Sequence, residues 1–119
     1  MNLRQIVGEF GESLAADYLI RKKYKIVDVN VKISHQEVDI IAKKESLFVF
    51  IEVKTRANFN FGSADEAMTS RKIKNLKKIV GAYVSDNNLD ENLVRYDFIS
   101  IDIDKEKKIA NLKHYKGII

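Results

Sequence analysis

Hydrophobic side chains recur near the amino terminus at intervals of three and four residues, which is the spacing of one helical face. The predicted helix begins after Asn2, which can form a capping box with Gln5, and it ends near residues 21–23. Its expected apolar stripe comprises Leu3, Val7, Phe10, Leu14 and Tyr18. This stripe is predicted to face the core.

A second, long helix is predicted in the second half of the chain, and the pair Asn87-Asn88 marks its end. Its start has two candidates, a capping box formed by Ser63 and Glu66, or Thr69. The expected buried stripe of this helix comprises Ile73, Leu76, Val80 and Val84.

Extended segments rich in β-branched and aromatic residues surround the second helix. They cover residues 24–33, 37–42, 47–55, 94–103 and 109–114. The order α-β-β-β-α-β-β predicts an α/β protein with a mixed central sheet flanked by helices. A length of 119 residues with 45% hydrophobic content suits one core, so we expect a single domain over residues 1–119.

Charged side chains interrupt two of these apolar strands. Alternate residues of a strand share a face, so Phe48 and Phe50 share theirs with Glu52 and Lys54. The preceding strand carries Asp39 in the same way. Because acids are rarely placed in buried strands without a partner, these residues are candidates for a functional site.

The register of the two strands decides whether the charges meet. A two-residue loop at Glu45-Ser46 would place Asp39 opposite Glu52. It would also pair Ala42 with Val49, Ile40 with Ile51, Val38 with Val53, and Glu37 with Lys54. A three-residue loop would mismatch the faces, and a four-residue loop would keep them but shift each pair by one diagonal. The pattern therefore favours an even loop.

Two opposed carboxylates at about 5 Å between Cβ atoms repel each other, and a divalent cation reverses that effect. Mg²⁺ or Mn²⁺ takes carboxylate oxygens and keeps waters, so Asp39 and Glu52 are predicted metal ligands. Lys54 would orient water and stabilise charge on a phosphate. The alternatives are an acidic pair neutralised by Lys54 and Arg56 without metal, or Lys54 serving only as a partner of Glu37.

The arrangement of Asp39 with Glu52-Val53-Lys54 resembles the PD-(D/E)xK nuclease motif, although the proline is absent. More of the chain resembles the YraN-like family of bacterial proteins. The residues that carry this resemblance are Gly11-Glu12, Gln36-Glu37-Val38-Asp39, Ile51-Glu52-Val53-Lys54-Thr55-Arg56, Phe61-Gly62 and Lys72. Gln36 departs from the pattern, because the family commonly has glycine at this position.

The resemblance implies a restriction-endonuclease-like fold and a metal-dependent phosphodiesterase, endonuclease-like, that acts on nucleic acid and more often on DNA. It also implies that Glu12 is a further catalytic or metal-binding residue beside Asp39 and Glu52. The helical pattern alone leaves Glu12 on the solvent side, although its neighbours Gly8 and Ala15 are small enough to admit another element.

Basic residues crowd the second helix and extend the site hypothesis. Arg71, Lys74 and Lys78 share one outward face, and Arg56 and Lys72 lie nearer the acidic pair in the sequence pattern. These residues are the predicted nucleic-acid contacts: Arg56, Arg71, Lys72, Lys74 and Lys78. The alternative is a face that only solvates the helix. Phe59 and Phe61 could stack on bases but are expected to pack beneath the helix.

Several classes of protein are disfavoured. The chain has no cysteine, and His35 and His114 lack the spacing of zinc ligands, so we expect ordinary loop or strand-end histidines. A signal-peptide core and an apolar run of about 20 residues are both missing, so we expect a soluble, cytoplasmic protein without a membrane partner. A net charge of +4 permits nucleic-acid binding. Two other functions remain open: a module that binds nucleic acid without cutting it, and a protein-interaction domain.

Overall fold

A computed structural model describes residues 2–33, 35–57 and 69–119. The two α-helices are α1 (Leu3–Arg21) and α2 (Ser70–Asp86). The strands are β1 (Lys25–Ile33), β2 (Gln36–Lys44), β3 (Leu47–Arg56), β4 (Val94–Asp104) and β5 (Ile109–Tyr115). A short 3₁₀ helix, η3 (Glu91–Leu93), precedes β4. The predicted order of helices and strands is confirmed.

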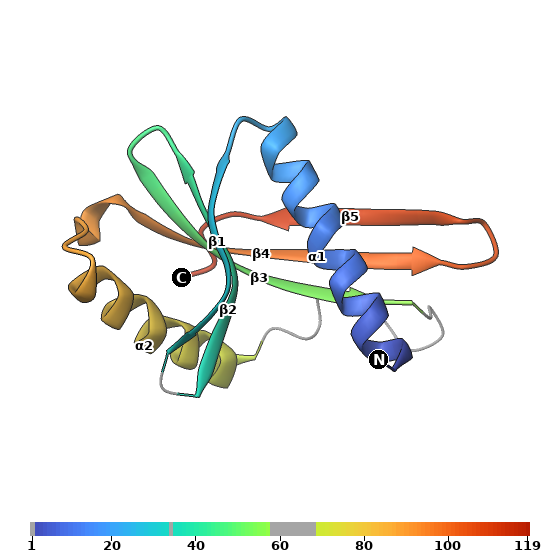
Figure 1. Ribbon diagram of the computed structural model, residues 1–119, viewed down its shortest axis with the longest axis horizontal. Coiled ribbons are helices and arrows are strands. Elements are labelled where there is room, and N and C mark those ends of the chain that lie inside the picture. Colours follow the sequence, from blue (N-terminus) through green and yellow to red (C-terminus); the bar gives the residue numbers. More distant parts are fainter. Residues whose placement is uncertain (1, 34, 58–68) are drawn as a thin grey trace.

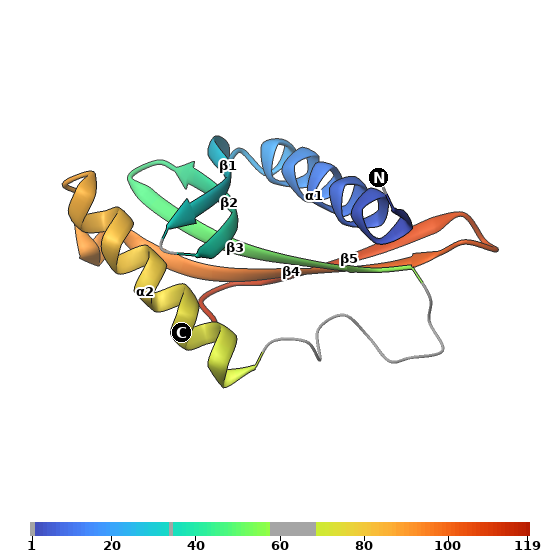
Figure 2. The same cartoon turned by 60° about the horizontal axis from the view of Figure 1, so that its bottom comes forward.

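The strands form a five-stranded sheet in the order β1-β2-β3-β4-β5. Only β3 and β4 run parallel, and α2 lies between them in the chain, as a crossover connection requires. Figures 1 and 2 show α1 and α2 on opposite faces of the sheet. The predicted mixed α/β architecture is therefore confirmed.

Each face of the sheet carries its own hydrophobic cluster. The cluster beneath α1 contains Leu19, Ile40, Ile51, Ile99 and Ile101 among its buried residues. The cluster beneath α2 contains Val38, Ile41, Phe50, Leu76, Ile79 and Val80. Both faces of the central strands are buried, which explains their nearly continuous apolar sequences.

The buried face of α1 differs from the predicted one. The helix buries Gly11, Ala15 and Leu19, whereas Leu3 and Phe10 of the predicted stripe are 62% and 50% exposed. Small residues occupy much of the buried face because they allow the helix to approach β3 closely. A Cβ atom at position 11 would overlap the side chain of Thr55.

The second helix follows one of the two predicted starts. Thr69 caps α2 and its hydroxyl oxygen accepts a hydrogen bond from the Lys72 amide at 3.2 Å, while Asn87 is the carboxyl-terminal cap. The buried residues are Leu76, Ile79 and Val80, and Val84 is partly buried. The other predicted start, Ser63 with Glu66, and the residues Phe59, Phe61 and Gly62 lie outside the described residues.

The β2–β3 hairpin confirms the predicted register from its turn as far as Ile40 and Ile51. Its turn occupies Glu45-Ser46, Ala42 pairs with Val49, and Ile40 pairs with Ile51. The predicted pair of Val38 with Val53 is wrong, because the β2–β3 pairing ends at Ile40 and Val38 packs beneath α2 instead. Figure 1 shows β1 and β2 bending away from β3 beyond this point.

Candidate active site

Asp39 lies where β2 separates from β3, and we call this point the fork. Its Oδ2 atom accepts a hydrogen bond from the backbone N–H of Val53 at 2.8 Å, so a side chain replaces the backbone ladder at the fork. Glu52 precedes Val53 in β3, and its carboxyl group interacts directly with that of Asp39. The fork thus brings the two predicted ligands together, although Asp39 and Glu52 are not a regular ladder pair.

Both carboxyl groups have raised pKa values. Burial, followed by the neighbouring negative charge of Glu52, raises the pKa of Asp39 to about 7, against the Val53 hydrogen bond that lowers it. Burial also raises the pKa of Glu52, while Lys72, the hydrogen bond with Asp39, and Lys54 oppose the rise. The pair holds one negative charge more easily than two, so the two carboxyl groups together retain a proton more readily than isolated carboxyl groups do.

Glu12 reaches the same fork from α1. Burial, followed by the charges of Asp39 and Glu37, raises its pKa to about 7. The side-chain amide of Asn30, with its nitrogen turned toward the two acids, donates to Glu12 Oε1 and Glu37 Oε1 at 3.0 Å each. Glu12 is therefore half-buried beside the acidic cluster, and it is not the solvated glutamate that the helical pattern alone suggests.

Positive charges also act on the acidic pair, and we call this basic group the basic side of the fork. Burial, followed by the charges of Lys72 and Arg56, lowers the pKa of Lys54, and Glu52 opposes this effect. Lys72, at the start of α2, acts on both Glu52 and Lys54. The structure therefore groups Lys54 with Lys72 and Arg56 and not with Glu37 as its main electrostatic neighbour.

The residues at the fork fit a hard divalent cation. Across residues 2–33, 35–57 and 69–119, no three histidine or acidic side chains are already placed together as a complete metal site. Mg²⁺ does not require one, since it is bound by one or two carboxylates with waters and substrate phosphates. Asp39 and Glu52 supply two such carboxylate ligands. A bound cation would displace the proton that the pair retains.

Comparison with known proteins assigns the family. The model of the uncharacterised protein family UPF0102 matches residues 11–101. The chain belongs to the UPF0102 family. Among its relatives, a UPF0102 protein of Flavobacterium psychrophilum is 39% identical over 110 residues, which cover 92% of this chain and 90% of the relative. A UPF0102 protein of Caldicellulosiruptor bescii is 38% identical over 117 residues, which cover 98% of both chains.

The UPF0102 assignment confirms the YraN-like resemblance drawn from the sequence motifs. The matched segment contains Glu12, Asp39, Glu52, Lys54 and Lys72. The family description and the names of these relatives carry no activity. In the described part of this UPF0102 chain, neither α-helix is long and apolar enough to cross a membrane.

The other predicted nucleic-acid contacts lie further out. All four predicted contacts on α2 are exposed, and Lys72 is the one whose charge acts on Glu52 at the fork; the others are Arg71, Lys74 and Lys78. Arg56, at the end of β3, acts on Lys54. The structure thus separates an inner basic group, Lys54, Arg56 and Lys72, from the outer face of α2.

Three polar residues at the fork were not anticipated as site residues. Glu37 and Asn30 belong to the acidic side, and Arg4 is a further positive charge that acts on Lys54. Asn30 has a positive φ of 50° inside β1, a conformation that asparagine tolerates better than most residues. In the sequence, the position of Asn30 between Val29 and Val31 of β1 could have indicated a functional residue.

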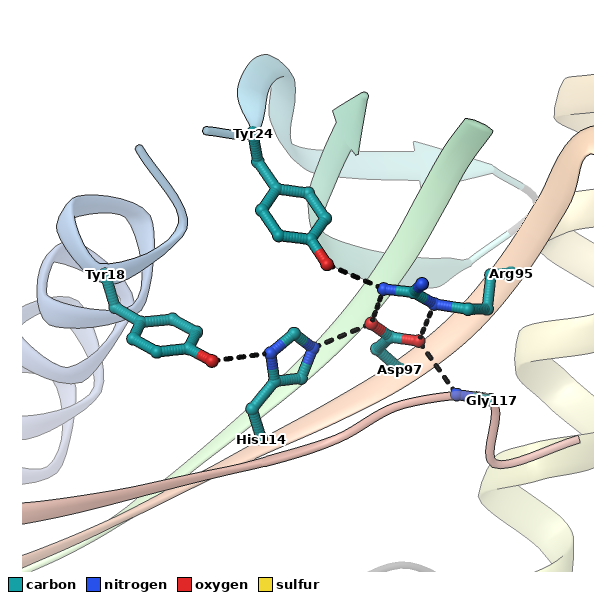
Figure 3. Close-up of polar contacts among 6 residues, drawn as sticks. All are labelled: Tyr18, Tyr24, Arg95, Asp97, His114 and Gly117. Atoms are coloured by element: carbon teal, nitrogen blue, oxygen red, sulfur yellow. Dashed lines mark hydrogen bonds and ion pairs between the residues drawn. The ribbon is translucent and has the colours of Figure 1, made fainter. Parts of the chain in front are cut away.

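A second polar cluster lies outside the fork and is shown in Figure 3. Asp97 of β4 is fully buried and accepts hydrogen bonds from Arg95 Nε and Nη2, both at 2.8 Å. His114 Nε2 lies 2.7 Å from Asp97 Oδ2, and the Gly117 amide donates to Oδ1 at 3.0 Å. His114 is therefore a buried network residue, which corrects the expectation of an ordinary strand-end histidine.

Tyrosines connect this cluster to the first third of the UPF0102 chain. The Tyr18 hydroxyl lies 2.9 Å from His114 Nδ1, and the Tyr24 hydroxyl accepts from Arg95 Nη2 at 2.8 Å. Burial alone would raise the pKa of Asp97, but hydrogen bonds from His114 and Arg95 hold it below its ordinary value. The cluster joins α1, β4, β5 and the carboxyl-terminal segment, and we assign it a structural role.

Proposed function

We propose that this protein is a divalent-metal-dependent phosphodiesterase that cleaves nucleic acid, with DNA as the expected polymer. The observation that carries the proposal is the meeting of Asp39 and Glu52 at the point where two strands diverge, beside Lys54. The resemblance to PD-(D/E)xK nucleases supports the same chemistry and the preference for DNA.

The acidic side of the fork would hold Mg²⁺ or Mn²⁺ through Asp39 and Glu52, with Glu12 as a further ligand or as support for one. When bound, such a cation polarises the phosphate, lowers the pKa of attacking water and stabilises the leaving oxygen. The protein's own contribution is to orient the Asp39 carboxylate, since the Val53 N–H donates to its Oδ2 atom.

The basic side of the fork would bind and orient the substrate phosphate. Lys54 and Lys72 lie beside Glu52, so a phosphate held by these lysines would lie next to the cation ligands. Burial lowers the pKa of Lys54, so the neutral amine, which can accept a proton from the attacking water, forms more easily. We therefore assign Lys54 the role of orienting water and phosphate.

A cleavage assay tests the proposal. Single-stranded, duplex, flapped and four-way substrates of DNA and RNA are incubated with Mg²⁺, Mn²⁺ or EDTA. We expect metal-dependent cleavage that Asp39→Asn and Glu52→Gln abolish, whereas Glu91→Gln, an exposed acid in η3, retains it. Lys54→Ala and Lys54→Arg should lose cleavage but keep most binding, since the arginine fork does not replace a compact ammonium. Cleavage that is equal in EDTA would contradict the proposal.

A second candidate is a module that binds nucleic acid without cleaving it. Gln36, where the family commonly has glycine, is half-buried at the start of β2, three residues before Asp39. It could restrict how closely a phosphodiester approaches the fork. Salt-dependent binding without cleavage on any substrate, unaffected by Asp39→Asn, would favour this candidate. The absence of salt-dependent binding would favour a protein-interaction domain instead.

A further inference from the structure

Cavities of about 430 and 460 Å³ lie at two different places on the described part of the protein. The one of about 460 Å³ includes Arg56, which belongs to the basic side of the fork. This cavity of about 460 Å³ is formed by the start of α1, the end of β3 and the β4–β5 turn. We call it the α1–β3 cavity, and its lining includes Leu3, Arg4, Val7, Arg56, Ala57 and Lys105.

The charged side chains in the described lining of the α1–β3 cavity are basic. Arg4, Arg56 and Lys105 come from three different elements, and none of the described lining residues is acidic. Two acids flank Lys105 in sequence, the exposed Glu106 and Asp104, and Asp104 uses its Oδ1 atom to accept hydrogen bonds from the Glu106 and Lys107 amides at 3.0 and 3.1 Å. Asp104 therefore stabilises the turn that presents Lys105.

Arg4 occupies a position that is unfavourable without an anion. It lies in the first turn of α1, which contains no acidic residue, so its positive charge adds to the positive end of the helix dipole. An anion in the cavity would be attracted by both the guanidinium and the dipole. The charge pattern of this helix end is thus complementary to a phosphate.

The remaining wall of the cavity is apolar. Leu3 is 62% exposed at the cavity and Val7 and Ala57 also line it. An inorganic anion would leave this apolar surface in water, whereas a sugar or base attached to a phosphate would cover it. The cavity volume lies within the range of small-ligand sites, about 300–1,000 Å³, which suits one nucleotide and not a duplex.

The cavity and the fork share their positive charges. Arg4 and Arg56 line the cavity, and both act electrostatically on Lys54. A strand whose phosphate lies at Lys54 therefore has a second basic position, at Arg4 and Arg56, for a neighbouring phosphate.

We propose that the α1–β3 cavity binds the phosphate and sugar of one nucleotide in the strand that enters the fork, and so positions that strand for cleavage. This inference rests on the proposed function, and it names a subsite of the substrate. The phosphate could be an internal phosphodiester or a terminal phosphomonoester, which share the same recognition chemistry.

Binding in EDTA tests the subsite separately from cleavage. Fluorescence anisotropy would compare the wild type with Arg4→Ala/Lys105→Ala, using DNA with a single-stranded tail that carries a 5′-phosphate, a 5′-hydroxyl or a 3′-phosphate. Arg21→Ala/Lys22→Ala is the matched control, because it removes the same charge from exposed positions at the other end of α1. Arg4→Lys/Lys105→Arg keeps the charge and tests for rescue, and thermal melts check folding.

We expect the Arg4/Lys105 variant to weaken binding at least tenfold more than the control. Its slope of log affinity against log salt should fall by about one unit for each lost phosphate contact. A nucleoside monophosphate should compete for the wild-type cavity, and the unphosphorylated nucleoside should not. A loss confined to terminally phosphorylated DNA indicates a terminal phosphomonoester, and a loss with every substrate indicates an internal phosphodiester.

Equal losses in the Arg4/Lys105 variant and the control would overturn the subsite, even if the wild type cleaves DNA. Conversely, a selective loss in the Arg4/Lys105 variant would support the subsite even if no metal produces cleavage. The failure of the subsite and the failure of the proposed function therefore give different results.

Discussion

Asp39 has two roles at the fork, and they impose different demands on its side chain. One oxygen accepts the Val53 N–H, which stabilises the end of the β2–β3 pairing. The carboxyl group as a whole faces Glu52 and carries an unfavourable charge when ionised. Stability and the proposed metal binding therefore depend on different properties of one residue.

Two substitutions of Asp39 separate these roles. Asp39→Asn keeps a hydrogen-bond acceptor and removes the charge, so the metal-free protein should be as stable as the wild type or more stable. Asp39→Ala leaves the Val53 N–H without a partner and should cost about 1–3 kcal/mol. Thermal melts in EDTA measure both effects, and Mn²⁺ should raise the melting temperature of the wild type alone. Asn and Ala variants of equal stability would contradict this account.

The acidic cluster also predicts a pH dependence. The pKa of Asp39 and that of Glu12 are raised from 3.8 and 4.5 to about 7, so the folded protein holds these protons more tightly than the unfolded chain. Their stabilising contribution is present at low pH and is lost as the pH rises through about 7. Asp97 has a lowered pKa, so its stabilising contribution is lost only at a pH below 5 and does not change between pH 5 and 8.

Melts between pH 5 and 8 should therefore show the metal-free protein losing stability as the pH rises. Mn²⁺ should bind more tightly over the same interval, because it competes with fewer protons at higher pH. The slope of stability against pH should decrease in Asp39→Asn. A flat profile for the wild type in EDTA would show that these carboxyl groups are solvated like ordinary surface acids.

At the scale of elements, the contact between α1 and β3 depends on one glycine. A Cβ on Gly11 would lie 2.7 and 2.8 Å from Thr55 Cβ and Cγ2, so rotation of the Thr55 side chain cannot relieve the overlap. Overpacking of this kind costs about 1–3 kcal/mol. The same contact sets where Glu12, the next residue, meets the fork.

Gly11→Ala is thus expected to lower stability and to weaken metal binding, because it shifts α1 and Glu12 relative to β3. Gly8→Ala is the matched control in the same helix, since an added Cβ there meets nothing within 4 Å. The control should gain up to about 1 kcal/mol from helix propensity. Denaturant melts would measure both, and equal behaviour of the two variants would refute a close α1–β3 contact.

The strands were predictable from sequence because alternation and turn length together leave few registers. Ile40 opposite Ile51, and the turn at Glu45-Ser46, follow from matching apolar faces. The face of α1 was not predictable from hydrophobicity, because the helix buries small residues around Gly11 and exposes Leu3 and Phe10. Close approach depends on side-chain size, which a hydrophobic pattern does not record.

The candidate site was predictable only in part for a similar reason. Asp39, Glu52 and Lys54 belong to one hairpin, so a local register brings them near each other. Arg4 joins them through tertiary packing of a distant helix. The Asp97 cluster likewise connects Tyr18 to His114, whose separation in sequence gives no local pattern.

At the scale of the molecule, the predicted nucleic-acid contacts and Lys54 fall into two groups of positive charge. The inner basic group lies at the fork, and the outer zone consists of Arg71, Lys74 and Lys78 exposed along α2. These outer residues cover about two turns and could follow a phosphate backbone. They would then contribute binding energy without contributing to cleavage.

Arg71→Ala/Lys74→Ala should reduce the salt slope of DNA binding by about one unit for each lost phosphate contact, similarly for all sequences. Cleavage at saturating substrate should be retained, because Lys72 is the α2 residue whose charge acts on Glu52 and Lys54, and it is unchanged in this variant. Binding titrations over a range of salt concentrations measure the slope, with Arg21→Ala/Lys22→Ala as the charge-matched control. A slope identical to that of the wild type would show that this face of α2 only solvates the helix.

The central claim is that Asp39 and Glu52 jointly bind one divalent cation. The most direct measurement is anomalous diffraction from crystals of the protein grown with Mn²⁺, compared with crystals of Asp39→Asn grown in the same way. We expect an anomalous peak within coordination distance of both carboxylates in the wild type and its loss in the variant. A wild-type map without a peak at the fork, or with the same peak in Asp39→Asn, would contradict the account.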